Sequence, residues 1–484
     1  GILVPRMSAA EMKAIPQPAE GLLVYNQTTS SFWYFKSEDL GWVEINGSAA
    51  GDRNPLMMSA INDADGDTKV ETEYNSNDNQ VRFSVSGDEI MRLRKNSHGS
   101  PMLEMENDAT SIMIGLNAGL NNNPDIINLN GLDNVFIGQN TGQSNMSGSG
   151  NVAIGIEALQ ENLSGWDNTA LGRSALSNNT TGEGNIGLGG YSLLANTTGN
   201  SNIGIGALCL ASNQTLSHLI AIGDSALYSN TEGEGNIAIG FQTLWSNLSG
   251  TDNLAIGNLS LGLNTIGNAN IALGSEALKK NTEGTGNIAI GYGTLIDNTT
   301  GGGNIAFGIG TLGKNTTGIN NFAAGEECLI KNTVGDNNIA VGFFALSDNT
   351  TGSDNISLGH GALALNTTGM SNIGIGKFAL GNAVELSNLV AIGDSALYMN
   401  GAGSTEIYHG RANTAIGKSA LSSNTIGNAN TAVGLRTLTS NVEGAANTAV
   451  GASALKGNTS GRDNVALGVS SMFFNSTGTG NVAL

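Results

Sequence analysis

The sequence predicts an all-β protein whose main part is a parallel β-solenoid of about 21 coils, each 17 residues long. Three observations predict this class. A glycine returns every 17 residues from Gly138 to Gly393 and again from Gly417 to Gly468, with Gly115 as an outlying first copy. The three residues before that glycine alternate between large apolar and small. The chain of 484 residues contains 70 glycines but only 5% aromatic residues, which is typical of a turn-dense solenoid.

Each 17-residue copy contains the elements of one coil, as in NIAIGFQTLWSNLSGTD at Asn236–Asp252. The alternation before the glycine predicts a short strand with large apolar side chains on one face and small ones on the other. A leucine follows four residues after the glycine and an asparagine seven after it, usually opening an Asn–Gly turn, because both residue types tolerate positive φ. We therefore expect strand, turn, second short strand and Asn–Gly turn, with equivalent residues stacked between coils.

A row of small residues three positions after the glycine indicates close approach of another surface. Because so thin a rod has little core of its own, we expect that surface to be a second copy of the chain, in a homo-oligomer. The row includes Ala158, Ala175, Ala226, Ala277, Ala345, Ala362 and Ala396.

The two cysteines, Cys209 and Cys328, occupy this same slot seven coils apart. At a coil rise of roughly 4.8 Å they are about 34 Å apart, which excludes a disulfide between them. Either cysteine replaces alanine in a packed row, or symmetry copies of one cysteine meet near an oligomer axis.

Residues 1–47 predict a separate module, with a hairpin around Asn26–Ser30 followed by a third strand, GWVEI. Its aromatic residues favour two interpretations, the core of a small module or a carbohydrate platform. They are Trp33, Tyr34, Phe35 and Trp42.

Residues 48–110 predict a polar, β-rich connector with a strand pair around Ser86–Asp88. Within its DADGDTK segment, Asp63, Asp65 and Asp67 are spaced like the oxygen ligands of a calcium loop. The other positions of that pattern do not match, so the alternative is an acidic turn entering an edge strand. Calcium is the only cofactor that the sequence suggests.

Residues 111–484 form the predicted solenoid, with breaks near 116–133 and 401–413. Loops that leave a regular rod are where contacts with a partner are expected. Two further stretches keep the period but change the usual turn sequence, Ser212–His218 and Asn382–Ser387, ten coils apart, which indicates duplication of a ten-coil block.

Composition and motifs argue against catalysis. The four histidines are scattered without metal-ligand spacing, and neither a nucleophile motif nor a phosphate loop occurs, so we expect no enzyme. A net charge of −20 argues against nucleic acid and anionic membranes as partners. No run of 18 apolar residues exists, so we expect no membrane insertion by this segment.

The N-x-A-I-G core with its following A-L resembles the repeats of trimeric autotransporter adhesin heads. The N-terminal GILVPRMSAAEMKAIPQPAEGLLVYNQTTSSFWYF and the DADGDTK segment are similar to lead-in modules of Bacteroidetes-type extracellular fibre proteins and of phage-like tail fibres. These resemblances imply a left-handed β-roll, a homotrimer and an extracellular, cell-surface or tail-mounted location. They carry over no binding residue.

The leading functional hypothesis is an extracellular fibrous adhesin, a rigid oligomeric rod that contacts a ligand on another cell, host or prey surface. The alternative is a passive structural shaft of a tail fibre, hook or appendage whose binding tip lies outside this segment. A glycan-degrading spike is a third reading, which the scarcity of inward acids opposes.

Overall fold

The computed structural model describes residues 4–37, 41–45, 60–62, 68–72, 80–86, 88–95, 99–105, 110–403 and 409–484. The chain divides into two compact units, Gly1–Thr110 and Ser111–Leu484. The first unit carries two small sheets and the second carries one long sheet.

The first sheet has four strands in the order β1-β2-β3-β4, with one short helix. The predicted hairpin is confirmed, because β2 pairs antiparallel with β3 and β3 pairs with β4, the predicted third strand. The helix begins with a capping box between Ser8 and Glu11, which satisfies its free N–H groups. The elements are β1 (Arg6–Met7), α1 (Ala9–Lys13), β2 (Leu23–Asn26), β3 (Ser31–Ser37) and β4 (Gly41–Glu44).

The aromatic residues of this sheet are divided between its core and its surface. Phe35 is buried and its ring lies 5.5 Å from that of Trp42, edge to face. Trp33, Tyr34 and Trp42 are half-buried, and the Trp33 indole donates to Ser31 Oγ at 2.8 Å. The core interpretation therefore holds for Phe35, and the carbohydrate platform stays a prediction.

The second sheet has five antiparallel strands in the order β5-β6-β7-β8-β9. The predicted strand pair around Ser86–Asp88 is confirmed by β7 and β8. Strand β6, which follows the DADGDTK aspartates, lies between β5 and β7, so the predicted edge strand is wrong. Asp63, Asp65 and Asp67 themselves lie outside the described residues, and calcium binding stays a prediction. The strands are β5 (Ala60–Asn62), β6 (Lys69–Thr72), β7 (Val81–Val85), β8 (Asp88–Lys95) and β9 (Pro101–Met105).

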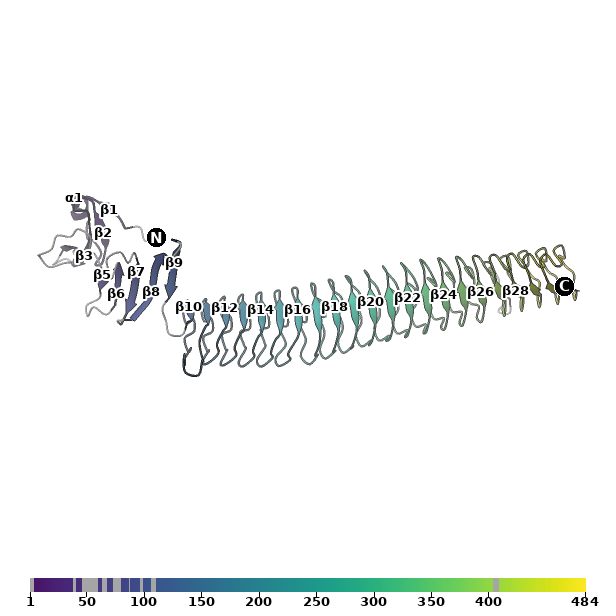
Figure 1. Cartoon of the computed structure of the whole chain (residues 1–484), viewed down its shortest axis with the longest axis horizontal. Coiled ribbons are helices and arrows are strands. Elements are labelled where there is room, and N and C mark those ends of the chain that lie inside the picture. The colour runs from purple at the N-terminus through teal and green to yellow at the C-terminus, as the bar shows by residue number, and fades with distance from the viewer. Residues whose placement is uncertain are drawn as a thin grey trace. The chain divides into compact units, whose positions relative to one another are not determined.

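The second unit is the predicted parallel β-solenoid, with 22 strands in chain order in a single sheet (Figure 1). Each coil contributes one strand, of three residues except for the two-residue β31, and most strands pair in register with the strand 17 residues later, for example Ile237 with Leu254. The longer connections before Val135 and Thr414 leave the sheet unbroken, because β10 still pairs with β11 and β26 with β27. The strands are β10 (Ile112–Ile114), β11 (Val135–Ile137), β12 (Val152–Ile154), β13 (Thr169–Leu171), β14 (Ile186–Leu188), β15 (Ile203–Ile205), β16 (Ile220–Ile222), β17 (Ile237–Ile239), β18 (Leu254–Ile256), β19 (Ile271–Leu273), β20 (Ile288–Ile290), β21 (Ile305–Phe307), β22 (Phe322–Ala324), β23 (Ile339–Val341), β24 (Ile356–Leu358), β25 (Ile373–Ile375), β26 (Val390–Ile392), β27 (Thr414–Ile416), β28 (Thr431–Val433), β29 (Thr448–Val450), β30 (Val465–Leu467) and β31 (Val482–Ala483).

The predicted second strand of each coil does not form. In the coil that begins at Gly240, Gln242 and Leu244 both have φ of 50°, in the left-handed region, which a strand cannot accommodate. Turns replace the strand there, yet the backbone still bonds from coil to coil, as Leu244 N–H donates to Ser260 C=O at 3.1 Å. The coil-to-coil ladder is therefore continuous on both sides of the solenoid.

The interior of the solenoid lies on the small-residue face of the strands. The middle residue of each strand from β11 to β30 is buried, as Ala238 is, while its flanking Ile237 and Ile239 are half-exposed. The leucine four after each glycine is also fully buried and packs into the same core. The large apolar residues of the strands are thus on the outside.

The small residues three positions after the glycine are also interior, which corrects the predicted oligomer contact. From Ala158 onward, every alanine in that row is fully buried within one chain. The row faces the inner side of the sheet: Ser260 Oγ donates to Ala272 C=O at 3.1 Å, and Cys328 Sγ to Ala340 C=O at 3.2 Å. Small side chains are needed there because the facing walls of one coil are close together.

Two rows of buried asparagines hold the coils together, which confirms the predicted stacking of asparagine on asparagine. In the first row Asn264 Nδ2 donates to Asn247 Oδ1 at 2.8 Å and to Gly267 C=O at 2.9 Å. In the second row Asn270 donates both its backbone N–H and its Nδ2 to Asn253 Oδ1, each at 3.1 Å. Buried amides require such partners, and here neighbouring asparagines of a row supply most of them. The first row is interrupted at Ala383 and the second at Leu219 and Leu389.

The predicted role of asparagine as a positive-φ turn residue is wrong. Neither Asn264 nor Asn270 has positive φ; the buried Leu261 does, at 49°. A left-handed leucine costs roughly 1–2 kcal/mol, whereas burying its side chain contributes roughly 1.5–3 kcal/mol. Burial in the stacked leucine row therefore offsets the backbone strain.

Candidate functional site

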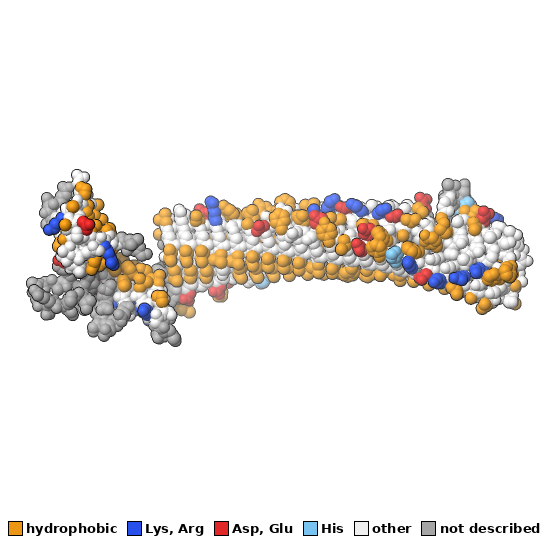
Figure 2. All heavy atoms as spheres, turned by 90° about the horizontal axis from the view of Figure 1, so that it is seen from above, with side chains coloured by type: hydrophobic (Ala, Val, Ile, Leu, Met, Phe, Trp, Pro, Cys, Tyr) orange, Lys and Arg blue, Asp and Glu red, His pale blue; other side chains and the backbone are white. Residues whose placement is uncertain are grey.

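The most extensive surface feature of the solenoid is the apolar double row, which we define as the first and third residues of strands β10–β31. These side chains point away from the core and are half-exposed or exposed, with Ile154 at 41%, Ile256 at 39% and Ile339 at 41%. Figure 2 shows them as parallel lines of hydrophobic side chains along the solenoid.

The apolar double row carries no charged residue in any of the 22 strands. Isoleucine, leucine and valine dominate, and threonine and phenylalanine provide most of the exceptions. At roughly 4.8 Å per coil the surface runs for roughly 100 Å. Monomeric proteins rarely expose a continuous apolar patch beyond a few hundred Å², so a surface of this kind marks an interface.

Charged residues gather on other parts of the coils. Lys280 and Lys314 both contact Asp297, with Nζ–Oδ distances of 2.8 and 3.0 Å, and Lys331 contacts Asp348 at 2.8 Å. Burial alone would raise the pKa of Asp297, but the hydrogen bonds from the two lysines lower it. These exposed pairs each contribute little to stability, and they keep that side of the solenoid hydrated.

The cysteines are interior, so the predicted meeting of symmetry copies near an axis is wrong. Cys209 and Cys328 are both free and fully buried within one chain. Cys209 Sγ contacts Ser192 Oγ at 3.1 Å and Gly206 C=O at 3.0 Å. Burial raises the pKa of Cys209 to about 11 and that of Cys328 to about 12. The packed-row interpretation is confirmed.

The first predicted break forms a short ordered loop. Asp125 and Asn130 form a β-bridge, and Asp125 Oδ1 accepts the Ile127 N–H at 3.0 Å. Ile127 at the tip is 93% exposed. At the second break, Asn400 Nδ2 donates to Gly410 C=O at 2.7 Å, while residues 404–408 lie outside the described part. Partner contacts at both breaks stay a prediction.

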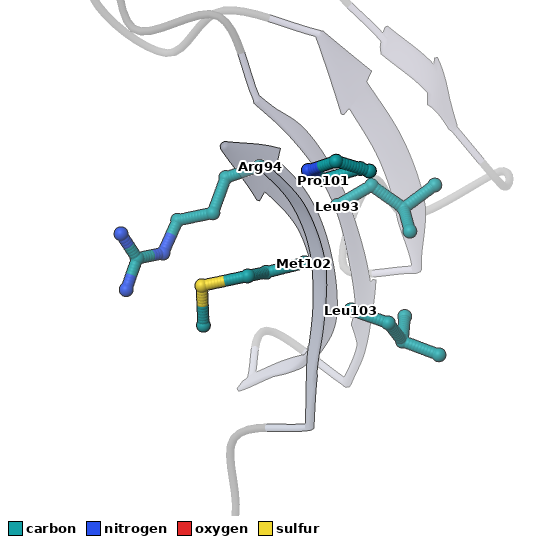
Figure 3. Close-up of a pocket in the computed structure, with 5 residues that line it drawn as sticks. All are labelled: Leu93, Arg94, Pro101, Met102 and Leu103. Carbon is teal, nitrogen blue, oxygen red and sulfur yellow. The ribbon is translucent and has the colours of Figure 1, made fainter. Parts of the chain in front are cut away.

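A depression of about 440 Å³ lies on the five-stranded sheet (Figure 3). Arg94 and Met102 point to one side of the strands, and Leu93 and Leu103 point to the other. Arg94 is already paired with Glu104 through a two-point contact, with Nε donating to Oε2 at 2.7 Å. The charge of Arg94 is therefore neutralised by Glu104. The other residues that line the depression are apolar and provide no catalytic groups.

Among the described residues, no three or more His, Cys, Asp or Glu side chains lie together where they could hold a metal ion. Within the same ranges, no helix has the length and apolarity to cross a membrane.

The first 62 residues match the model of a known family, the phage tail like trimerisation region. Neither the curated proteins nor the solved structures contain a match to the chain. The matched region together with the solenoid indicates a fibrous, structural, tail-fibre-like protein, and it supports a homotrimer. The predicted relation to autotransporter heads stays a prediction.

The sequence reasoning missed the apolar double row as a surface, although two signals were present. The position between the two large residues is nearly always alanine, glycine or serine, which indicates the tighter, inner side. The outer positions never contain a charge, although the chain has 60 residues of Lys, Arg, Asp and Glu. A solvent-facing strand position without selection for burial would have received some of them.

Proposed function

We propose that the chain forms a homotrimeric, non-catalytic fibre in which three solenoids pack along their apolar double rows. The single observation that carries this proposal is the continuous uncharged apolar face on a strand ladder that the described residues of its own chain leave uncovered. The trimerisation match at residues 1–62 supplies the order of the assembly.

The regular period explains how three such chains associate along their whole length. Each coil presents the same outward apolar residues one coil rise further along, so a contact made at one rung is repeated at the next. Three copies arranged around one axis form a closed assembly that removes the apolar face of every chain from water. A trimerisation region near the N-terminus would bring the chains together in register.

Such a rod functions in attachment, because it is stiff and spans the distance to another surface. The paired coils and the buried asparagine rows make each chain a stiff spacer, while the charged and turn residues remain on the outside of the trimer. We propose an extracellular or tail-mounted fibre that contacts another cell or surface. The alternative, a passive shaft with its binding tip beyond this segment, shares the same assembly.

Size-exclusion chromatography coupled to light scattering tests the assembly. We expect three times the 49.3 kDa chain mass and an elongated profile. A monomer at micromolar concentration would overturn the trimer. Binding to bacterial cells separates adhesion from a purely structural role. It is measured for the labelled trimer and for a trimer shortened by whole coils. An adhesive rod binds the cells through its own surface, and a passive shaft does not bind them.

A further inference from the structure

An aromatic track crosses four consecutive coils, those that begin at Gly342, Gly359, Gly376 and Gly393. Neighbouring rings are in contact: centroid distances are 5.4 Å from Phe343 to His360, 5.1 Å from His360 to Phe378 and 6.2 Å from Phe378 to Tyr398. The track consists of Phe343, Phe344, His360, Phe378 and Tyr398.

The coils make room for these rings with glycines. A Cβ on Gly361 would lie within 3 Å of the Phe378 ring, and a Cβ on Gly381 would lie at 3.0 Å from the Tyr398 ring. Phe344 and Phe378 also occupy left-handed backbone positions, with φ of 56° and 57°. That conformation is costly for a bulky residue. The track is thus built against local preference, at positions where most coils carry small or polar residues.

The track is exposed although it is apolar. Phe343 is 41% and Tyr398 38% exposed, and His360 also lies at the surface. The other ring contacts between aromatic residues of the described solenoid are single pairs, Phe307 with Phe322 and Phe473 with Phe474. Phe241 and Tyr292 take part in no ring contact between aromatic residues of the described part of the chain. Mutual packing of rings in a core cannot explain the track, because its members keep contact with water.

The chemistry around the rings suits a ligand with apolar faces and hydroxyl edges. Lys377 Nζ lies 5.2 Å from the Phe378 ring centroid, and Asp394 Oδ1 accepts the backbone N–H of Lys377 at 3.2 Å. The opposite charges of Lys377 and Asp394 therefore flank the rings and cancel each other. His360 and the Tyr398 hydroxyl add hydrogen-bonding groups. Aromatic side chains with a polar handle bind one apolar and one wet surface at once. Sugar rings present both.

We propose that the aromatic track is a binding site for a neutral oligosaccharide chain lying along the solenoid. Three coil rises of roughly 4.8 Å make the track roughly 14 Å long, enough for a few sugar residues. The site goes beyond the proposed fibre and is independent of it, because all its residues come from one chain.

Isothermal titration calorimetry of the full chain with four neutral hexasaccharides, cellohexaose, maltohexaose, isomaltohexaose and N-acetylchitohexaose, tests the site. We expect at least one to bind, and the Phe343→Ala/Tyr398→Ala variant to bind it at least tenfold more weakly. The matched control is Phe241→Ala/Tyr292→Ala, which removes two exposed aromatics off the track and should leave Kd within twofold. Saturation-transfer NMR should show transfer from aromatic protons to the sugar.

The proposal is overturned if none of the four sugars binds, or if the track variant and the control variant bind equally well. Circular dichroism and light scattering of both variants verify the fold and the mass. A monomeric chain that binds the sugar would refute the trimer and keep the track, so failures of the two proposals are distinguishable.

Discussion

Ala383 follows Asn366 by one coil and takes the place of the asparagine that would continue the first asparagine row. Asn366 Nδ2 donates to Asn349 Oδ1 at 2.9 Å, but Ala383 occupies the next position of the row. Within the described part of the chain, the buried Asn366 Oδ1 therefore has no hydrogen-bond partner. A buried carbonyl oxygen without a partner costs roughly 1–3 kcal/mol.

Replacing Ala383 with asparagine should repair this boundary. The equivalent coil ten repeats earlier shows the expected geometry: Asn213 Nδ2 donates to Asn196 Oδ1 at 3.2 Å and to Leu216 C=O at 3.1 Å. We expect Ala383→Asn to stabilise the fold by about 1 kcal/mol, seen as a higher urea midpoint with an unchanged slope. The control Ala379→Asn places an amide at a buried position outside the asparagine rows and should destabilise the fold. Equal effects of both variants would contradict the row as the cause.

The buried leucine row should be sensitive to truncation. Leu312 is fully buried with φ of 52°, whereas Ile309 in the same coil is 56% exposed. We expect Leu312→Ala to cost roughly 2–5 kcal/mol and Ile309→Ala to change stability by less than about 0.5 kcal/mol. Thermal unfolding monitored by circular dichroism measures both.

The backbone of Leu312 allows a sharper comparison. Glycine in regular structure is usually less stable than alanine, but at positive φ it relieves strain. We therefore expect Leu312→Gly to be at least as stable as Leu312→Ala. A glycine variant about 1 kcal/mol less stable would mean that the left-handed strain is absent.

The period of the sequence predicts the solenoid, the in-register ladder of the strands before each glycine and the stacking of Asn247 under Asn264, because a fixed spacing places equivalent residues above one another. It does not predict that turns replace the second strand of each coil. It does not predict which strand face is inside. Ile239 is large and apolar, and hydrophobicity alone assigns it to the core. The narrow interior reverses this, since only a residue as small as Ala238 fits between the facing walls.

The sequence also does not predict the positive φ of Leu244. Residue preference assigns left-handed backbone to glycine and asparagine, and here tertiary packing overrides that preference because the leucine side chain gains more by burial than the backbone loses. The aromatic track has a partial sequence signal, since Phe343 and His360 are one period apart, but Tyr398 joins it from a different position in its coil.

Charges placed on the apolar double row should prevent trimer formation. Ile239, Ile256 and Leu273 are outward residues of three successive strands. The triple variant Ile239→Lys/Ile256→Lys/Leu273→Lys would bring nine like charges together in the trimer without partners, which is strongly unfavourable. We expect light scattering to give the mass of a monomer or of weakly associated chains. The control Leu263→Lys alters a 42% exposed residue between two of these strands, off the sheet, and should keep the trimer. A triple variant that stays trimeric would show that the interface lies elsewhere.

The two buried thiols predict a specific dependence of stability on alkaline pH. Cys209 and Cys328 have pKa values of about 11 and about 12 in the fold, against an ordinary value of 9.0. Because the folded pKa is higher, the folded chain holds thiol protons that the unfolded chain releases. The two thiol protons contribute to the free energy of unfolding in full below pH 9. This contribution falls as pH rises above 9 and is lost once pH passes 11 to 12, and in total it is on the order of a few kcal/mol. Alanine already fills this slot in most coils, so Cys209→Ala/Cys328→Ala is a mild change.

We therefore expect the wild-type chain to lose more stability than the double variant between pH 8 and pH 10.5, measured by urea unfolding at each pH. At pH 8 neither thiol should react with a disulfide reagent in the native chain, and both should react once the chain is unfolded, because the thiolate is the reactive form and burial withholds it. Rapid native-state labelling of either cysteine would show that the interior row is open to solvent. Parallel pH profiles for the two proteins would instead place the alkaline transition on other groups.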